Sequence, residues 1–248
     1  MSEMSVPETL SVCPLGDTPY AEGLRLQDSL VRARAAGETG DWLLYPDHPP
    51  VLTMGRGGHG DSLIADPGTL ERLGLEVFEV ARGGDVTWHG PGQLVGYLIC
   101  DLERRGRDLH GFLRDLEASL VTALESYGLS GSTVPGRTGV WVGEAKIASI
   151  GIAVRRWVSY HGFALNVAPD LGFFDLIHPC GLRGIRMTSL EALGGPAAAE
   201  VAVARERVTA ALGARLGYHQ VRWTEPGEVR AIATAARPTA EAGSANAA

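Results

Sequence analysis

Residues 138–168 contain three stretches in which apolar side chains alternate with small or polar ones, separated by short turns. The stretches are 138–143, 146–155 and 157–168. An alternation with a period of two is typical of β-strands, and turns this short join antiparallel neighbours. A further, buried strand is expected at 93–102, where the sequence reads "QLVGYLICDL". A sheet should therefore form the centre of this chain.

Helical patterns surround these strands. An amphipathic helix is expected at 18–37, with Thr18 as its N-terminal cap and Gly37 at its end. A second helix is expected at 108–127, with its leucines on one face, and a third at 199–216. Shorter strands are expected at 41–48, 51–55 and 75–80, and a short helix at 67–74.

These elements predict one α+β domain, in which helices pack on a mixed, largely antiparallel sheet. The domain is expected to span residues 11–220. Residues 1–10 are expected to be flexible, and residues 228–248 are expected to be a disordered tail because they are small and polar. No repeat or internal linker suggests a second domain.

The composition argues against several kinds of protein. The N-terminus lacks the basic start and apolar run of a signal peptide, and no apolar stretch is long enough to span a membrane. Three scattered cysteines without a CxxC pair argue against a disulfide framework or a zinc site. A net charge of −7 argues against general nucleic-acid binding. We expect a cytoplasmic protein that needs no metal.

The chain has 22 basic side chains, and Lys146 is the only lysine among them. Arginine stays charged in proteins, whereas lysine can exchange a proton. A stray lysine in an arginine-rich chain is an equally good explanation on composition alone. If Lys146 has a function, it should be one that arginine cannot perform.

Cys180 lies between a proline and a glycine, two residues after His178. A cysteine that serves packing usually has apolar neighbours on a helix or strand, whereas this one is expected on a turn. It is therefore either an accident of the surface or a nucleophile that needs access.

Residues 81–97, "ARGGDVTWHGPGQLVGY", combine two glycine clusters with polar side chains. Glycines allow the backbone to approach a ligand closely. A glycine-rich hairpin loop explains one cluster, but explains less well why Arg82, Thr87, His89 and Gln93 lie in the same short run. The segment is neither a Walker loop nor a dinucleotide fingerprint. The related stretch "GRGGHG" at 55–60 is more typical of a surface turn.

Two strands carry further signals. In a strand at 146–154, one face would hold mostly small residues, Ser149 and Gly151 among them. Such a face leaves room for an acyl chain, although a closely packed helix would explain it as well. His161 and Asn166 are polar residues in an otherwise apolar strand, where a hydrogen-bonded core histidine is the commoner case.

Four motifs together, "RGGDVTWHGPGQLVGY", "GVWVGEAKIASIGIAV", "HGFALNV" and "HPCG", resemble those of the lipoyl(octanoyl) transferases. The resemblance extends from about residue 11 to about residue 216 and implies the fold of lipoate and biotin protein ligases. It implies that Cys180 carries the acyl group as a thioester and that Lys146 is its catalytic partner. It also implies a substrate-binding set that comprises Arg82, Gly83, Gly84, Asp85, Val86, Thr87, Trp88, His89, Ser149, Ile150, Gly151, Gly162, Phe163 and Ala164. His161 and Asn166 are expected to support this site.

The resemblance implies octanoyl-acyl carrier protein as donor, and as acceptors the lipoyl domains of 2-oxoacid dehydrogenases and the glycine cleavage H protein. No ATP or other cofactor is expected, because the amide product lies downhill from a thioester. A lysine ammonium beside the cysteine would lower the thiol pKa and then cycle a proton, which arginine cannot do. The alternatives left open are an ATP-dependent lipoate or biotin ligase of the same fold, a thiol hydrolase and an acyl-binding module without activity.

Overall fold

The computed structural model describes residues 8–58, 62–178, 184–194 and 200–236. Its centre is an eight-stranded sheet. In spatial order the strands are β11 (Gln220–Trp223), β1 (Thr9–Asp17), β2 (Asp41–Asp47), β6 (Gln93–Ile99), β10 (Val158–Asn166), β9 (Ala145–Arg155), β8 (Arg137–Val142) and β7 (Gly131–Val134). β1 pairs in parallel with both β11 and β2, and the remaining pairs are antiparallel. The expected α+β domain with a mixed sheet is therefore confirmed.

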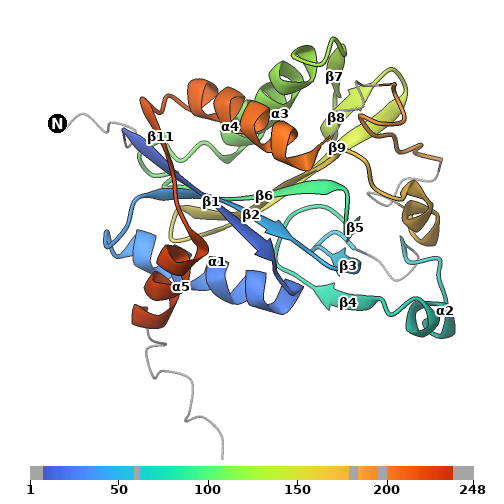
Figure 1. The fold of residues 1–248 in the computed structure, drawn as a ribbon, viewed down its shortest axis with the longest axis horizontal. Helices are drawn as coiled ribbons and strands as arrows, with labels where there is room; N and C mark the ends of the chain where they lie inside the picture. Colours follow the sequence, from blue (N-terminus) through green and yellow to red (C-terminus); the bar gives the residue numbers. More distant parts are fainter. Residues whose placement is uncertain (1–7, 59–61, 179–183, 195–199, 237–248) are drawn as a thin grey trace, which may run out of the picture.

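Helices cover both faces of this sheet (Figure 1). α3 (Leu109–Glu125) and α4 (Val201–Arg215) lie on one face, and α1 (Tyr20–Ala35) and α5 (Pro226–Ala235) lie on the other. Each face of the sheet has its own apolar core: the larger lies under α3 and α4, and the second lies under α1 and α5. The leucine face expected at 108–127 is buried in the larger core, where Leu116, Leu120 and Leu124 are fully inaccessible. Burying side chains of this size contributes about 1.5–3 kcal/mol each, so these layers hold the sheet rigid beneath the site.

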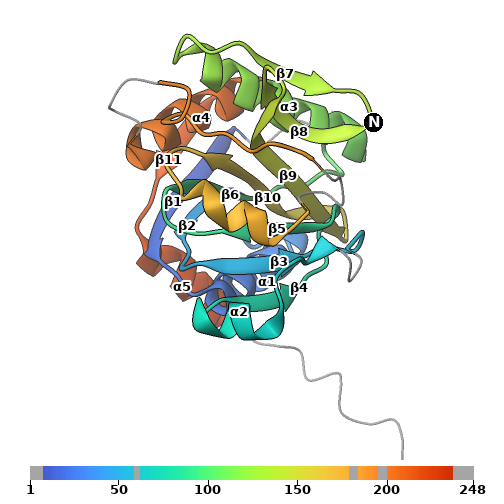
Figure 2. The same cartoon turned by 90° about the vertical axis from the view of Figure 1, so that its right-hand side faces the viewer.

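A second, three-stranded sheet stands beyond one end of the large sheet (Figures 1 and 2). It comprises β4 (Glu76–Glu79), β3 (Val51–Met54) and β5 (Val86–His89), and it packs against α2 (Pro67–Arg72) and the 3₁₀ helix η2 (Leu171–Leu176) through a third apolar cluster. The small sheet positions the glycine-rich motif, because β5 is its edge strand and the loop at 81–85 leads into β5.

Short polar residues fix several helix ends. Asp66 and Asp108 accept hydrogen bonds from the first-turn amides of α2 and α3, as N-terminal caps do. Gly37 follows the last turn of α1 with a φ of +76°, which favours glycine, so the expected end of this helix is confirmed. The expected cap at the other end is wrong: Pro19 occupies the cap position, and the Thr18 hydroxyl donates to the Gly16 carbonyl instead.

Both expected chain termini need correction. Residues 9 and 10, expected to be flexible, begin β1, and residues 1–7 lie outside the described residues. Residues 228–235, expected to be disordered, belong to α5, whose Val229 is fully buried against the second core. The small residues of this segment suit a helix that packs closely on α1. The rest of the expected tail, residues 237–248, lies outside the described part of the chain.

Candidate active site

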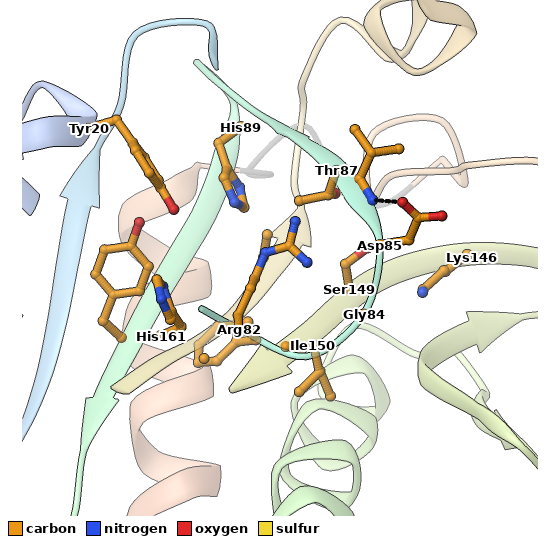
Figure 3. A pocket seen from close by; sticks show the side chains of 16 residues that line it. Tyr20, Arg82, Gly84, Asp85, Thr87, His89, Lys146, Ser149, Ile150 and His161 are labelled. Atoms are coloured by element: carbon orange, nitrogen blue, oxygen red, sulfur yellow. Dashed lines mark hydrogen bonds between the residues drawn. The ribbon is translucent and has the colours of Figure 1, made fainter. Parts of the chain in front are cut away.

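A pocket lies where the glycine-rich loop and β5 meet β9 and β10 (Figure 3). It brings together twelve of the fourteen residues expected to bind substrate, together with Lys146 and His161. The expected residues that line it are Arg82, Gly84, Asp85, Val86, Thr87, His89, Ser149, Ile150, Gly151, Gly162, Phe163 and Ala164. These residues come from segments that lie far apart in the sequence, so three of the four motifs converge on one place.

The pocket has two ends (Figure 3). Lys146 lies at one end, and Tyr20, His89 and His161 gather at the other, with the Arg82 side chain between them. Tyr20 and Tyr97 also line the pocket, although neither was singled out in the sequence. Tyr97 is the last residue of the glycine-rich motif, so the sequence could have indicated it. Tyr20 is the first residue of α1 and lies outside every motif.

The glycine-rich loop rests directly on β9. The Gly83 amide donates to the Ile152 carbonyl at 2.9 Å, and a β-carbon at Gly151 would stand 2.8 Å from the Gly83 oxygen. The small face of β9 therefore does not face a helix. Part of it is covered by this loop, and only the remainder lines the pocket.

The stretch at 55–58 supports the loop from behind. The amides of Gly55, Arg56 and Gly57 donate to the carbonyls of Asp85, Arg82 and Gly84, at 3.2, 3.0 and 2.9 Å. A β-carbon at Gly55 would stand 2.4 Å from the Gly84 oxygen. This turn is therefore a structural part of the site. The sequence, which suggested only a surface turn at 55–60, did not predict this role. Residues 59–61 lie outside the described residues.

Arg82 is a buried cation, 8% exposed. Its guanidinium donates to the carbonyl and hydroxyl oxygens of Thr53 at 2.6 and 2.8 Å, and to the Gly83 carbonyl at 3.1 Å. These bonds tie the loop to β3 and place a fixed positive charge across the middle of the pocket.

The histidines at the far end of the pocket are neutral at ordinary pH. Burial, with smaller contributions from the nearby His48 and Arg82, lowers the pKa of His89 to about 3. Burial, with a contribution from Arg82, also lowers the pKa of His161 to about 3. A base with such a low pKa is a poor proton carrier near neutrality. These side chains are therefore suited to orienting groups by hydrogen bonds.

His161 has a strained backbone. Its φ is +58°, in the left-handed region that non-glycine residues seldom occupy, and its amide donates to the Gln27 side-chain oxygen at 2.7 Å. Gln27 belongs to α1 and is buried. Such strain persists only where surrounding contacts hold it, and it is concentrated at functional sites.

Lys146 is 1% exposed. Its Nζ donates to the Thr138 carbonyl at 3.1 Å and lies 5.1 Å from the centroid of the Trp141 ring. A buried ammonium needs such partners, because leaving water carries a large desolvation cost. The amine is thus held at the end of the pocket by β8.

Cys180 lies outside the described residues, but the chain on both sides of it is anchored beside the pocket. On one side, the His178 amide donates to the Ser62 carbonyl at 2.7 Å, and the Ser62 hydroxyl donates to Asp85 at 2.5 Å. On the other side, the Lys146 amide donates to the Arg186 carbonyl and the Lys146 carbonyl accepts from Thr188, at 2.8 and 2.9 Å.

Asn166 does not line the pocket. It is buried, accepts from Gln93 Nε2 at 2.9 Å and donates to the Thr188 carbonyl at 2.9 Å, while Gln93 contacts His89 at 3.2 Å. Asn166 therefore links the His89 side of the pocket to the segment that follows Cys180 in sequence, which is a supporting position.

Two expected binding residues lie elsewhere. Gly83 lines an adjoining groove instead of the pocket. Trp88 stacks on Phe173 in the third apolar cluster, with ring centroids 4.8 Å apart. Neighbouring residues of a strand point to opposite faces, so Thr87 and His89 reach the pocket while Trp88 faces the core.

The pocket is narrow in this structure, with a free volume of about 40 Å³. That is room for only a few water molecules, because each needs about 10–15 Å³ of such space. A ligand of several carbon atoms therefore requires side chains to move. Among the described residues, no cluster of three or more His, Cys, Asp or Glu side chains suits a metal ion, and no helix has the length and hydropathy of a membrane span.

Comparison with known proteins agrees with the motifs. The lipoyl protein ligase A/B catalytic domain matches residues 19–213. Octanoyltransferases of Geobacter sp. (strain M21) and Rubrobacter xylanophilus are 54% and 53% identical to this chain over 177 and 178 residues, which is 71% of this chain and 82% and 80% of theirs. The octanoyltransferase of Syntrophotalea carbinolica is 49% identical over 186 residues, covering 75% of this chain and 85% of its own.

The fold also matches solved structures. Lipoate-protein ligase A bound with ATP has a TM-score of 0.68 at 16% identity, covering 91% of this chain and 92% of its own. A bi-partite lipoate protein ligase from Thermoplasma acidophilum has a TM-score of 0.65 at 14% identity, covering 93% and 92%. These likenesses confirm the expected lipoate-ligase fold. The sequence identities and the domain match show that this chain belongs to the octanoyltransferase family of enzymes.

Proposed function

We propose that this chain transfers an octanoyl or lipoyl group from acyl carrier protein to a lysine of a lipoyl domain, with Cys180 holding the acyl group in between. The observation that carries the proposal is the burial of the only lysine, Lys146, at the end of the pocket. The acceptors would be the lipoyl domains of 2-oxoacid dehydrogenases and the glycine cleavage H protein. The reaction belongs in the cytoplasm, where thiols stay reduced.

In the first half-reaction, the Cys180 thiolate attacks the thioester carbonyl of the donor. The bond between this carbon and the carrier's sulfur breaks, and the Lys146 ammonium protonates the departing thiolate. A free thiol has a pKa of about 8.5, so a neighbouring ammonium favours the reactive form. The products are an acyl-enzyme and the free carrier thiol.

In the second half-reaction, the acceptor lysine attacks the Cys180 thioester as a neutral amine. The Lys146 amine takes the proton that the acceptor nitrogen loses, the amide forms, and the Cys180 thiolate departs. Lys146 is thereby returned to its ammonium form. The thioester supplies the driving force, so the transfer needs no ATP.

The acyl chain would occupy the pocket. Its walls are formed partly by backbone at Gly84, Gly151 and Gly162, where the absence of side chains lets a methylene chain approach closely. Because the free volume is small, the chain enters by displacing side chains, and Arg82 lies directly in its course.

Intact-mass spectrometry tests the proposal. The protein is incubated with octanoyl-acyl carrier protein in the absence of ATP. We expect one octanoyl adduct, its absence from Cys180→Ser, and its disappearance when a lipoyl domain is added and gains the octanoyl group on lysine. An adduct that requires free octanoate and ATP would indicate a ligase instead. Release of octanoate to water without an acceptor would indicate a hydrolase.

A further inference from the structure

A second cavity lies beside the pocket, lined by residues of α3 and β8, and these two elements are neighbours in the fold (Figure 1). We call it the α3–β8 groove and define it by Leu109, Leu113, Arg137, Thr138, Trp141 and Ile185. Its volume is about 410 Å³, roughly ten times the free volume of the pocket. Trp141 and Gly83, which line this groove, belong to two of the sequence motifs, whereas α3 and the turn between β7 and β8 carry none of the motif residues.

The groove and the pocket meet at the reacting end of the site. Both are lined by Gly84, Lys146, Ile150 and Gly151. An acyl thioester has two arms, an acyl chain on the carbonyl carbon and a second arm on the sulfur. If the acyl chain occupies the pocket and the carbonyl lies near Lys146, the arm on sulfur must leave in another direction.

We infer that the α3–β8 groove binds the phosphopantetheine arm of the donor thioester. This inference rests on the proposed function, because it requires an acyl thioester that reacts near Lys146. The arm combines methyl and methylene groups with two amides and ends in a phosphate. Leu109, Leu113 and Trp141 provide the apolar surface, and the exposed Arg137 provides a cation for the phosphate.

The charge and exposure of the groove indicate which arm of the donor it suits. Among the described lining residues there is no carboxylate, although the whole chain has a net charge of −7. Gly136, Arg137 and Thr138 are exposed, whereas nearly all residues of the pocket are buried. An octanoyl chain gains more from the buried walls of the pocket, and a phosphate-bearing arm gains more from a groove with an exposed cation at its rim.

Three octanoyl donors that differ only in the arm test this inference. They are octanoyl-phosphopantetheine, octanoyl-pantetheine without the phosphate, and octanoyl-N-acetylcysteamine, which has only the terminal part of the arm. The measured quantity is kcat/KM for acylation of Cys180. Leu113→Trp, which fills the groove, should lower it by about tenfold or more for both pantetheine donors and by less than about twofold for N-acetylcysteamine.

Arg137→Ala tests the phosphate end separately. It should lower kcat/KM by about tenfold for the phosphorylated donor and leave the other two unchanged. The control is Arg114→Ala, because Arg114 is an exposed arginine of α3 that does not line the groove. Arg114→Ala should have the same small effect on kcat/KM with all three donors.

The remaining outcomes separate the inference from the function on which it rests. Equal losses on all three donors, a shorter preferred acyl chain, or a loss confined to transfer from Cys180 to the lipoyl domain would each overturn the groove assignment. If Leu113→Trp and Arg137→Ala behave as wild type on every donor, the assignment is also wrong, while Cys180 acylation of the wild type still supports the transferase. If the wild type accepts octanoyl neither from any of these three donors nor from octanoyl-acyl carrier protein, the proposed function itself fails.

Discussion

A β-carbon at Gly139 would stand 2.5 Å from Lys146 Cε and 3.1 Å from its Nζ. Gly139 has a φ of +136°, and its amide donates to the buried Glu117 side chain at 3.0 Å. The strand beside Lys146 therefore leaves space for the lysine only because residue 139 has no side chain. The position of the amine depends on a contact between β8 and β9 as well as on its own residue.

Gly139→Ala should move the Lys146 amine, both directly and through the Ala148 carbonyl oxygen, which the new β-carbon would approach to 2.6 Å. It should lower kcat by at least about tenfold, because small displacements of a catalytic group are costly. Gly143→Ala is the matched control: Gly143 also has a positive φ, +58°, but a β-carbon there meets no atom within 4 Å. The control should lose only about 1–2 kcal/mol of stability, the cost of a β-carbon in the left-handed region. A folded Gly139→Ala variant, verified by thermal unfolding, with unchanged kcat would contradict this prediction.

Lys146→Met should lower kcat by about 10²–10⁴-fold, the usual contribution of a positioned acid–base group, with KM for the donor nearly unchanged. Methionine is close to lysine in shape and keeps the contacts with Trp141, so folding is preserved. Steady-state kinetics with octanoyl-acyl carrier protein measure the effect. Retention of more than about a tenth of kcat would show that the amine carries no essential proton.

Tyr20→Leu should shift the preference of the enzyme towards longer acyl chains. The Tyr20 ring lies at the end of the pocket remote from Lys146, 6.3 Å from His89 and backed by Phe78 at 5.0 Å. Room for two more methylenes contributes about 1.6 kcal/mol at about 0.8 kcal/mol each. This corresponds to roughly a tenfold change in the decanoyl-to-octanoyl ratio of kcat/KM.

Competition between the two acyl donors measures that ratio. Tyr160→Leu is the control, because Tyr160 contacts His161 at 5.0 Å but does not line the pocket. An equal shift in both variants, or none in Tyr20→Leu, would place the limit on chain length elsewhere.

Stability should fall as the pH drops below about 6.5. Burial lowers the pKa of His48 to about 4 and that of both His89 and His161 to about 3, against an ordinary value of 6.5. The unfolded chain therefore takes up protons between pH 6.5 and 4 that the folded chain does not. The histidines' contribution to the free energy of unfolding is fully present above this range. It decreases within the range by up to about 1.4 kcal/mol per pH unit for each histidine.

Denaturant titrations between pH 7.5 and 4.5 measure this slope. His89→Gln should make the slope shallower by about one proton's contribution. His110→Gln and His219→Gln are controls because both residues are exposed. A slope that is unaffected by His89→Gln would show that His89 is protonated in the folded protein.

Val229→Asp should loosen α5 and expose Cys13. Val229 and Cys13 are both fully buried in the core that α5 covers, and burial raises the pKa of the Cys13 thiol. The rate of thiol labelling, measured in a Cys180→Ser background, should therefore rise for Cys13 and stay low for Cys100, which is buried in the other core. Ala231→Asp, at an exposed position of the same helix, should have little effect. Equal labelling in the two variants would contradict the packing role of α5.

The sequence by itself determined the main strands, most helices and the segments that form the pocket. Alternation and capping act between residues a few positions apart, so they are visible in one dimension, as Asp108 before α3 and the strands at 146–155 and 157–168 show. The motifs identified the family, and the family resemblance led to the expectation that Lys146 and Arg82 share a site. Those signals failed at 228–235, where a helix of small residues depends on α1 for its stability.

The tertiary structure alone decided which side chains reach the pocket. Tyr20 lines it because α1 crosses the sheet beside His161, and Trp88 does not because β5 turns that residue towards Phe173. Gly151 of β9 lies against the loop at 82–84, a contact that no local pattern indicates. Each of these outcomes depends on contacts between residues that are remote in sequence, and such contacts are settled by packing in three dimensions.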